Sequence, residues 1–171
     1  MILGMTTQAF TTLHVVISLI AILSGFLVAI GFLNAKRSDG LTGLFLATTI
    51  LTSVTGFLFP ISQITPGIVV GIISLAVLTI AVVAQYARAL AGAWRKTFVI
   101  TAMLALYFNV FVLVVQSFQK IPPLKSLAPT QSEPPFAITQ GMVLLGFVVL
   151  TVAAIRKFRV VEAPKTRAAS A

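Results

Sequence analysis

Residues 10–33 read FTTLHVVISLIAILSGFLVAIGFL and contain no Asp, Glu, Lys or Arg. Four further stretches share this property: 41–59, 68–86, 98–118 and 138–155, and we expect the last to begin near residue 136. Each has about 18–24 residues, enough for a helix to cross a hydrocarbon core of roughly 30 Å at about 1.5 Å per residue. Because a chain inside lipid must satisfy its own backbone hydrogen bonds, each stretch is predicted to be helical.

The composition of the whole chain agrees with this pattern. Of its 171 residues, 58% are hydrophobic and only 9% are charged, which is too little polar surface for a soluble domain of this size. The sequence therefore predicts an all-α integral membrane protein, an up-down bundle of five transmembrane helices within residues 1–155. The connections 34–40, 60–67 and 87–97 are short, which favours antiparallel neighbours. The first stretch is too long for a cleaved signal peptide, and nothing basic precedes it.

The Lys and Arg residues predict the orientation of this bundle. Ten of the twelve lie on one side of the plan, so the positive-inside rule places the N-terminus outside and the C-terminus in the cytoplasm. Charges at helix ends argue against a nucleic-acid partner, despite the net charge of +9. The basic tail 156–171 is predicted to be disordered beyond about Val161 and to attract anionic lipid headgroups. The ten are Lys36, Arg37, Arg88, Arg95, Lys96, Arg156, Lys157, Arg159, Lys165 and Arg167; the other two are Lys120 and Lys125.

The outer connection 119–135 is rich in proline. We expect these prolines to exclude a regular helix and to favour extended or turn structure. The segment is either a plain linker or a lid or docking loop for a protein partner, with Pro122, Pro123, Gln131 and Glu133 as the docking candidates. The prolines are Pro122, Pro123, Pro129, Pro134 and Pro135.

Several polar side chains fall at a similar depth in the outer half of the predicted bundle. Unpaired buried amides and imidazoles cost about one to several kcal/mol, so these groups are expected to face each other. Two interpretations stay open: a hydrogen-bonded clamp, or a small cavity open to the outside that binds a quinone headgroup, another small ligand or water. The candidate ligand-binding residues are His14, Ser18, Thr55, Gln116 and Gln140, with Asn109 near the midplane.

Small and hydroxyl residues carry a packing signal. Ser18, Ala21, Gly25 and Ala29 lie along one face of the first helix, where small side chains allow close helix approach, either within the chain or between copies. The hydroxyls of 41–59 are expected to bond mostly to carbonyls of their own helix.

No catalytic or metal constellation is visible in the sequence. The chain has no Cys and a single His, and its three acidic residues all lie outside the apolar stretches. A triad, a structural metal site and an ion-coupled pump are therefore not predicted, and the chain is not expected to be an enzyme. Haem would need Met103 or Met142 beside His14; we predict no cofactor, and quinone or haem has no direct support.

Two runs carry a resemblance: LATT at 46–49 with TSVTGF at 52–57, and LAPTQSEPPF at 127–136. In these runs, and over nearly its whole length, the chain resembles a family of small bacterial multi-pass inner-membrane proteins. The resemblance implies a bacterial inner-membrane location and no activity.

Three functional hypotheses follow from these features. The first is a non-enzymatic accessory or partner-binding subunit that uses the outer connection. The second is a membrane protein that binds a small ligand or quinone in the polar layer. The third is a homo-oligomeric channel or transporter, since one chain with five helices is small for a pore.

Overall fold

The computed structural model describes residues 1–60 and 66–158. Its helices are α1 (Thr7–Leu33), α2 (Asp39–Gly56), α3 (Pro66–Val82), which continues as the π-helical turn η1 (Val83–Ala87), α4 (Ala93–Lys120), α5 (Pro122–Leu127) and α6 (Pro134–Lys157). The described residues form no β-strand, so the all-α prediction is confirmed. Residues 159–171 lie outside the described residues, and the predictions made for this part of the tail stay predictions.

Four of these elements are long and apolar enough to cross a membrane. They are α1, the Gly67–Ala87 part of α3 and η1, α4 and α6, with 27, 21, 28 and 24 residues. Helix α2 is not among them: it has 18 residues, begins with Asp39 and is rich in hydroxyl side chains. The structure therefore supports a multi-pass membrane protein, but it does not confirm the predicted count of five spans.

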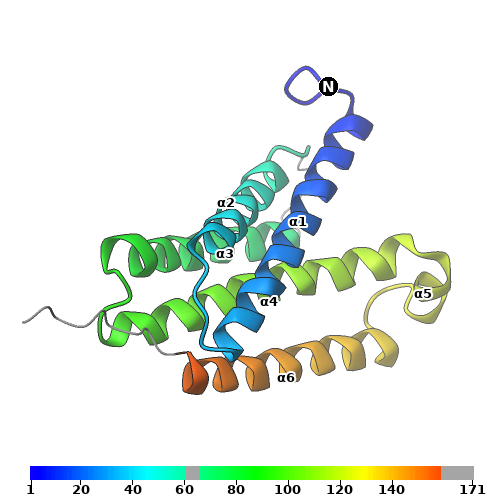
Figure 1. Cartoon of the computed structure of the whole chain (residues 1–171). Coiled ribbons are helices and arrows are strands. Elements are labelled where there is room, and N and C mark those ends of the chain that lie inside the picture. The colour runs from blue at the N-terminus through cyan, green and yellow to red at the C-terminus, as the bar shows by residue number, and fades with distance from the viewer. Residues whose placement is uncertain (61–65, 159–171) are drawn as a thin grey trace, which may run out of the picture.

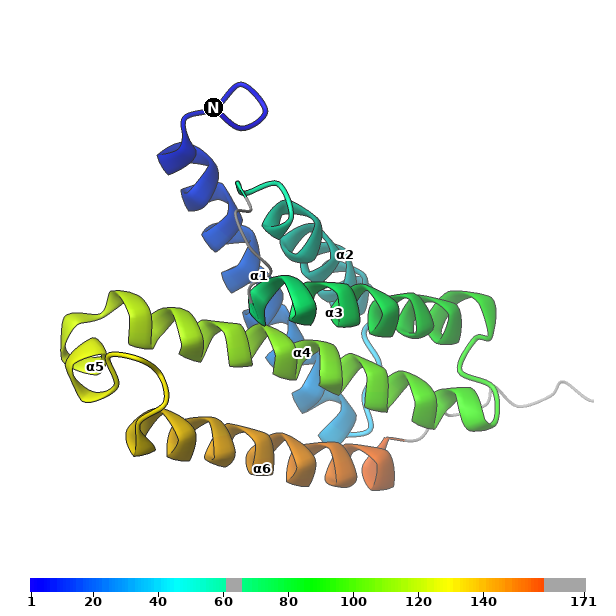
Figure 2. The same ribbon diagram turned by 180° about the vertical axis from the view of Figure 1, so that it is seen from behind.

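Helix α4 lies at the centre of the molecule. Helices α3 and α6 run along its two sides, and α1 and α2 form a pair that crosses this layer obliquely (Figures 1 and 2). Neighbours in the sequence contact each other, α1 with α2, α2 with α3, α3 with α4 and α4 with α6. The short connections explain this order.

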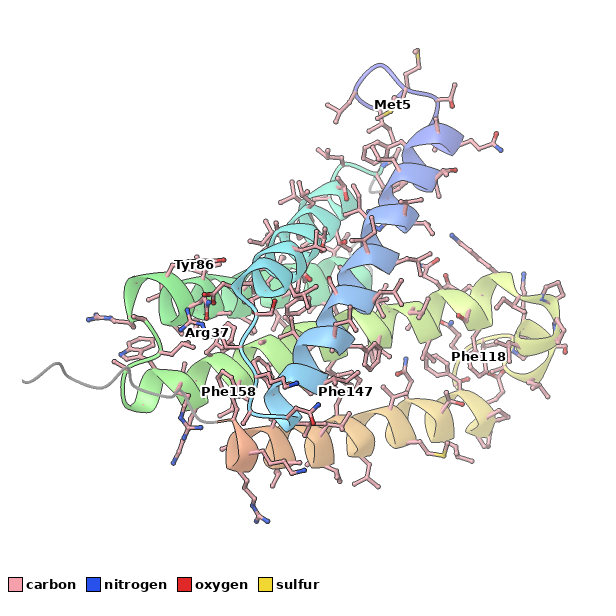
Figure 3. The ribbon with its side chains drawn as sticks, viewed as in Figure 1. Met5, Arg37, Tyr86, Phe118, Phe147 and Phe158 are labelled. Atoms are coloured by element: carbon pink, nitrogen blue, oxygen red, sulfur yellow. The ribbon has the colours of Figure 1, made fainter. Side chains whose placement is uncertain are left out.

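The best-packed part of the molecule lies where α1 ends, α4 begins and α6 ends. Phe158 packs against Phe32 with ring centroids 4.8 Å apart, and Phe98 packs edge-on against Phe32 at 5.7 Å. Figure 3 labels Phe158 and Arg37 toward this end and Phe118 at the other. We call this region the closed end. The guanidinium of Arg95 donates to the backbone carbonyls of Phe158 and Ile155, which caps the C-terminus of α6.

The small-residue face of α1 packs within the chain. Ala21, Gly25 and Ala29 are all buried. A Cβ atom added at Gly25 would lie 2.6 Å from Leu106 and 2.8 Å from Phe45, so α1 approaches α2 and α4 as closely as glycine permits. Of the two interpretations of this face, the structure shows packing inside one chain.

The outer connection differs from the expectation. It contains the short helix α5, and Pro122–Pro123 and Pro134–Pro135 occupy the first positions of α5 and α6. The first helical residues need no hydrogen-bonded backbone N–H, and the φ angle fixed by proline suits them. The prediction that prolines exclude a regular helix was wrong for these four, because they begin helices instead of interrupting them. Pro129 lies in a turn, as predicted.

Candidate ligand-binding site

A pocket of about 550 Å³ opens in the half of the molecule away from the closed end. Its walls come from the first half of α1, the end of α2, the beginning of α3 and the second half of α4. We call it the outer pocket. Its wall is mainly apolar, with Phe57, Phe59 and Phe108 as its aromatic members. Its polar residues are Thr11, His14, Ser18, Thr52, Ser53, Ser74, Asn109, Gln116, Ser117 and Lys120.

His14 is held in a defined orientation on α1. Its Nδ1 lies 2.8 Å from the Thr55 hydroxyl oxygen, and its ring packs edge-on against Phe59 with centroids 5.3 Å apart. The backbone of Gly56 lies beside the imidazole, and a Cβ atom added there would make an ordinary van der Waals contact of 3.7 Å with His14 Cε1. Thr55 near the end of α2 and Phe59 just after it thus orient the one histidine of the chain.

Ser18 lies one turn further along α1. Its hydroxyl donates to the His14 backbone carbonyl at 2.7 Å. Toward the pocket, the hydroxyl oxygen can therefore only accept a hydrogen bond. Both residues project from the same face of α1, as the i, i+4 spacing predicts. The sequence therefore placed these two side chains on the same wall correctly.

Helix α4 contributes Asn109 and Gln116 to the facing wall. Asn109 donates to the Thr49 hydroxyl at 3.3 Å, which ties the deep part of the pocket to α2. Within the described residues, the Gln116 side chain has no hydrogen-bond partner, and it is exposed. Asn109 thus has a structural bond, whereas Gln116 is available to a ligand.

Gln140 is not part of this arrangement. Its amide nitrogen donates to the Phe111 carbonyl at 3.1 Å, and its amide oxygen is buried without a partner among the described residues. These contacts lie between α6 and α4, away from the α1–α4 wall. Thr55 does not line the pocket either and instead supports His14 from behind. The six predicted residues therefore separate into four on the pocket wall, one support and one elsewhere.

Lys120 is a member of the site that was not predicted from the sequence. In the sequence it is one of the two basic residues on the predicted outer side, and in the structure it lies on the pocket wall. The signal was present in the spacing, because Lys120 follows Gln116 by four residues on the same helical face. Among the described lining residues there is no Asp or Glu. The outer pocket thus combines an apolar wall with two amides, an imidazole and one cation. Of the two methionines considered as partners of His14, Met103 is buried in the core and Met142 is exposed on α6, and neither lines the pocket.

The outer connection beside the pocket is folded onto α4. Gln131 donates to the Val115 carbonyl at 2.8 Å, and Phe118 packs edge-on against Phe136. Glu133 accepts hydrogen bonds from Thr130 and from the Ser132 backbone N–H. Of the four docking candidates, Gln131 and Glu133 therefore make bonds within the chain, while Pro122 and Pro123 are exposed.

No relative of known function or structure guides the assignment of this pocket. No protein-family model, curated protein or solved structure matches the chain.

Proposed function

We propose that the chain is a multi-pass protein of the bacterial inner membrane that binds a small amphipathic ligand, such as a quinone, in the outer pocket without acting as an enzyme. The observation that carries this proposal is a cavity of about 550 Å³ whose apolar wall also presents His14, Gln116 and Lys120. This volume is within the range of about 300–1,000 Å³ typical of ligand sites, and a few polar groups in an apolar wall are what fixes a ligand's orientation.

The proposed topology has five crossings, an outer N-terminus and a cytoplasmic C-terminus. Its support is a contact between Gln85, in η1, and Asp39, at the start of α2, whose side chains are 3.1 Å apart. This contact places the end of α3 beside the start of α2. Helices α2 and α3 are therefore antiparallel neighbours, which supports a return crossing by α2, although α2 itself is short and polar.

A pair of glutamine variants tests the ligand proposal. Gln116→Ala removes an amide that is exposed in the pocket, so it should reduce ligand retention with little change in melting temperature. Gln140→Ala removes an amide bonded to α4 outside the pocket, so it should lower the melting temperature and leave ligand retention unchanged. After extraction into lipid nanodiscs, native mass spectrometry measures ligand retention and thermal unfolding measures the melting temperature of each variant. Equal loss of ligand and stability in the two variants would favour the structural clamp.

A second proposal, an accessory subunit that binds a protein partner, is supported by apolar exposure at the outer connection. Ile121, just before α5, is 46% exposed, and Leu127, the last residue of α5, is 56% exposed. A photo-crosslinking residue at Leu127 should capture a partner protein in the native membrane. The same residue at Leu145, which is 65% exposed on α6, is the lipid-facing control. Equal protein adducts at both positions would contradict a specific docking site.

A further inference from the structure

The hydroxyl group of Thr55 decides which nitrogen of His14 carries a proton. A threonine hydroxyl has one proton to donate. Thr55 Oγ1 lies 2.7 Å from the Leu51 carbonyl, one turn earlier in α2, as in the bonds that Thr48 and Thr79 make with their own helices. Donation to a carbonyl of the same helix is the usual behaviour of threonine in a membrane helix. The oxygen therefore has only lone pairs left for His14.

An oxygen that offers only lone pairs requires a donor opposite it. The partner is His14 Nδ1, at 2.8 Å, so this nitrogen must carry a hydrogen. In the neutral imidazole, Nε2 then keeps its lone pair and is a hydrogen-bond acceptor. A charged imidazolium would need an anionic neighbour within the membrane, and the described residues of the pocket wall include none.

Resting on the proposed function, we infer that the ligand of the outer pocket carries an O–H or N–H group that donates to His14 Nε2. Within the described residues, Nε2 has no hydrogen-bond partner of its own, although His14 lines the pocket. Lys120 and the Gln116 amide provide donors on the opposite wall for an acceptor of the same headgroup. This combination fits a hydroxylated ring with an apolar tail, such as a phenol or the reduced, quinol form of a quinone. It narrows the proposed ligand class, because the oxidised quinone has acceptors alone.

The chain offers a direct test of the tautomer because His14 is its one histidine. Nuclear magnetic resonance of isotope-labelled histidine in nanodiscs should show a proton on Nδ1 and none on Nε2. The variant Thr55→Ser keeps the acceptor and should preserve this tautomer, whereas Thr55→Val removes it and should give a mixture. A proton found on Nε2 in the unchanged protein would overturn the inference, whether or not the pocket binds ligands.

A matched pair of probes tests the ligand class. Para-octylphenol donates one hydrogen bond, and para-octylanisole has the same body with the donor replaced by a methyl ether. The phenol should bind about five- to tenfold more tightly, the equivalent of one hydrogen bond, and should shift the Nε2 resonance. The preference should fall in Thr55→Val and persist in Thr55→Ser.

The outcomes separate the two proposals. Suppose that the two probes bind equally and that both lose binding in Ser18→Leu. This result would overturn the donor requirement and leave the pocket as a binding site. No binding of either probe would contradict ligand binding in the pocket itself, and the inference would fail with it.

Discussion

The closed end and the outer pocket are built from similar residues but pack very differently. Both contain small side chains along one helix, Ala29 of α1 at the closed end and Gly71 and Ser74 of α3 at the outer pocket. At the closed end, buried aromatic rings fill the space between the helices, and the remaining cavity is about 20 Å³. In the outer half, about 550 Å³ stays open. Small residues therefore permit close packing, but large neighbours are needed to complete it.

The largest effect that can sharpen this comparison is the loss of an aromatic ring. Phe98 is 1% exposed and packs on Phe32, so Phe98→Ala should lower the free energy of unfolding by about 3–5 kcal/mol. Phe57 faces the outer pocket and is partly exposed, so Phe57→Ala should cost less than half as much. Unfolding in mixed detergent measures both losses. Equal losses would show that the outer half is packed as tightly as the closed end.

A smaller effect is expected from adding one methyl group to α1. In Gly25→Ala, the new Cβ meets Leu106 and Phe45 at less than van der Waals distance, so stability should fall by about 1–3 kcal/mol. The control is Gly141→Ala on α6, because nothing lies within 4 Å of a Cβ atom there. The same unfolding measurement applies. A neutral result at Gly25 would mean that the contact of α1 with α2 and α4 can move to accommodate extra volume.

The smallest effect concerns acid and the outer connection. Desolvation would raise the pKa of the Glu133 carboxyl, but hydrogen bonds from the backbone and from Thr130 and Ser132 outweigh it, so this pKa lies below its ordinary value of 4.5. Because the pKa is lower in the folded state, the stabilisation by Glu133 is present above about pH 4.5 and is lost as the pH falls through the folded-state value.

Hydrogen exchange of residues 128–133 as a function of pH measures this loss. The unchanged protein should lose protection in acid, whereas Glu133→Gln should show weaker protection that does not change over the same range. Identical pH profiles for the two proteins would exclude a role for the Glu133 carboxylate in ordering the connection.

Much of the fold could be predicted from hydropathy, because the bilayer sets the length and polarity of every crossing segment. The four longest apolar helices lie where the uncharged stretches predict them. Helix α2 is the exception, because Asp39 and its many hydroxyl residues lower its overall hydropathy, although hydroxyls of Thr48, Thr52 and Thr55 bond to carbonyls of the same helix. For the prolines of the outer connection, composition alone did not indicate whether they interrupt helices or begin them.

The candidate site could be predicted only in part, because depth is easier to obtain from sequence than rotation. Counting residues placed His14, Gln116 and Gln140 at similar depth. Which way each side chain points depends on the rotation of its helix. Helix α6 is apolar around most of its circumference, so its sequence has no polar face to fix the direction of Gln140. On α1 and α4, small or polar residues at helical spacing mark one face, and there the prediction agrees with the geometry.

The bond between Arg95 and Phe158 has a consequence for how the chain is made. The two residues are 63 positions apart in the chain. At a translation rate of about 5–20 residues per second, several seconds separate the synthesis of these two partners. During that interval Arg95 has no carbonyl from α6 to bind, and the aromatic cluster lacks the ring of Phe158. A ribosome stalled before α6 should therefore hold an intermediate whose closed end is open to proteases.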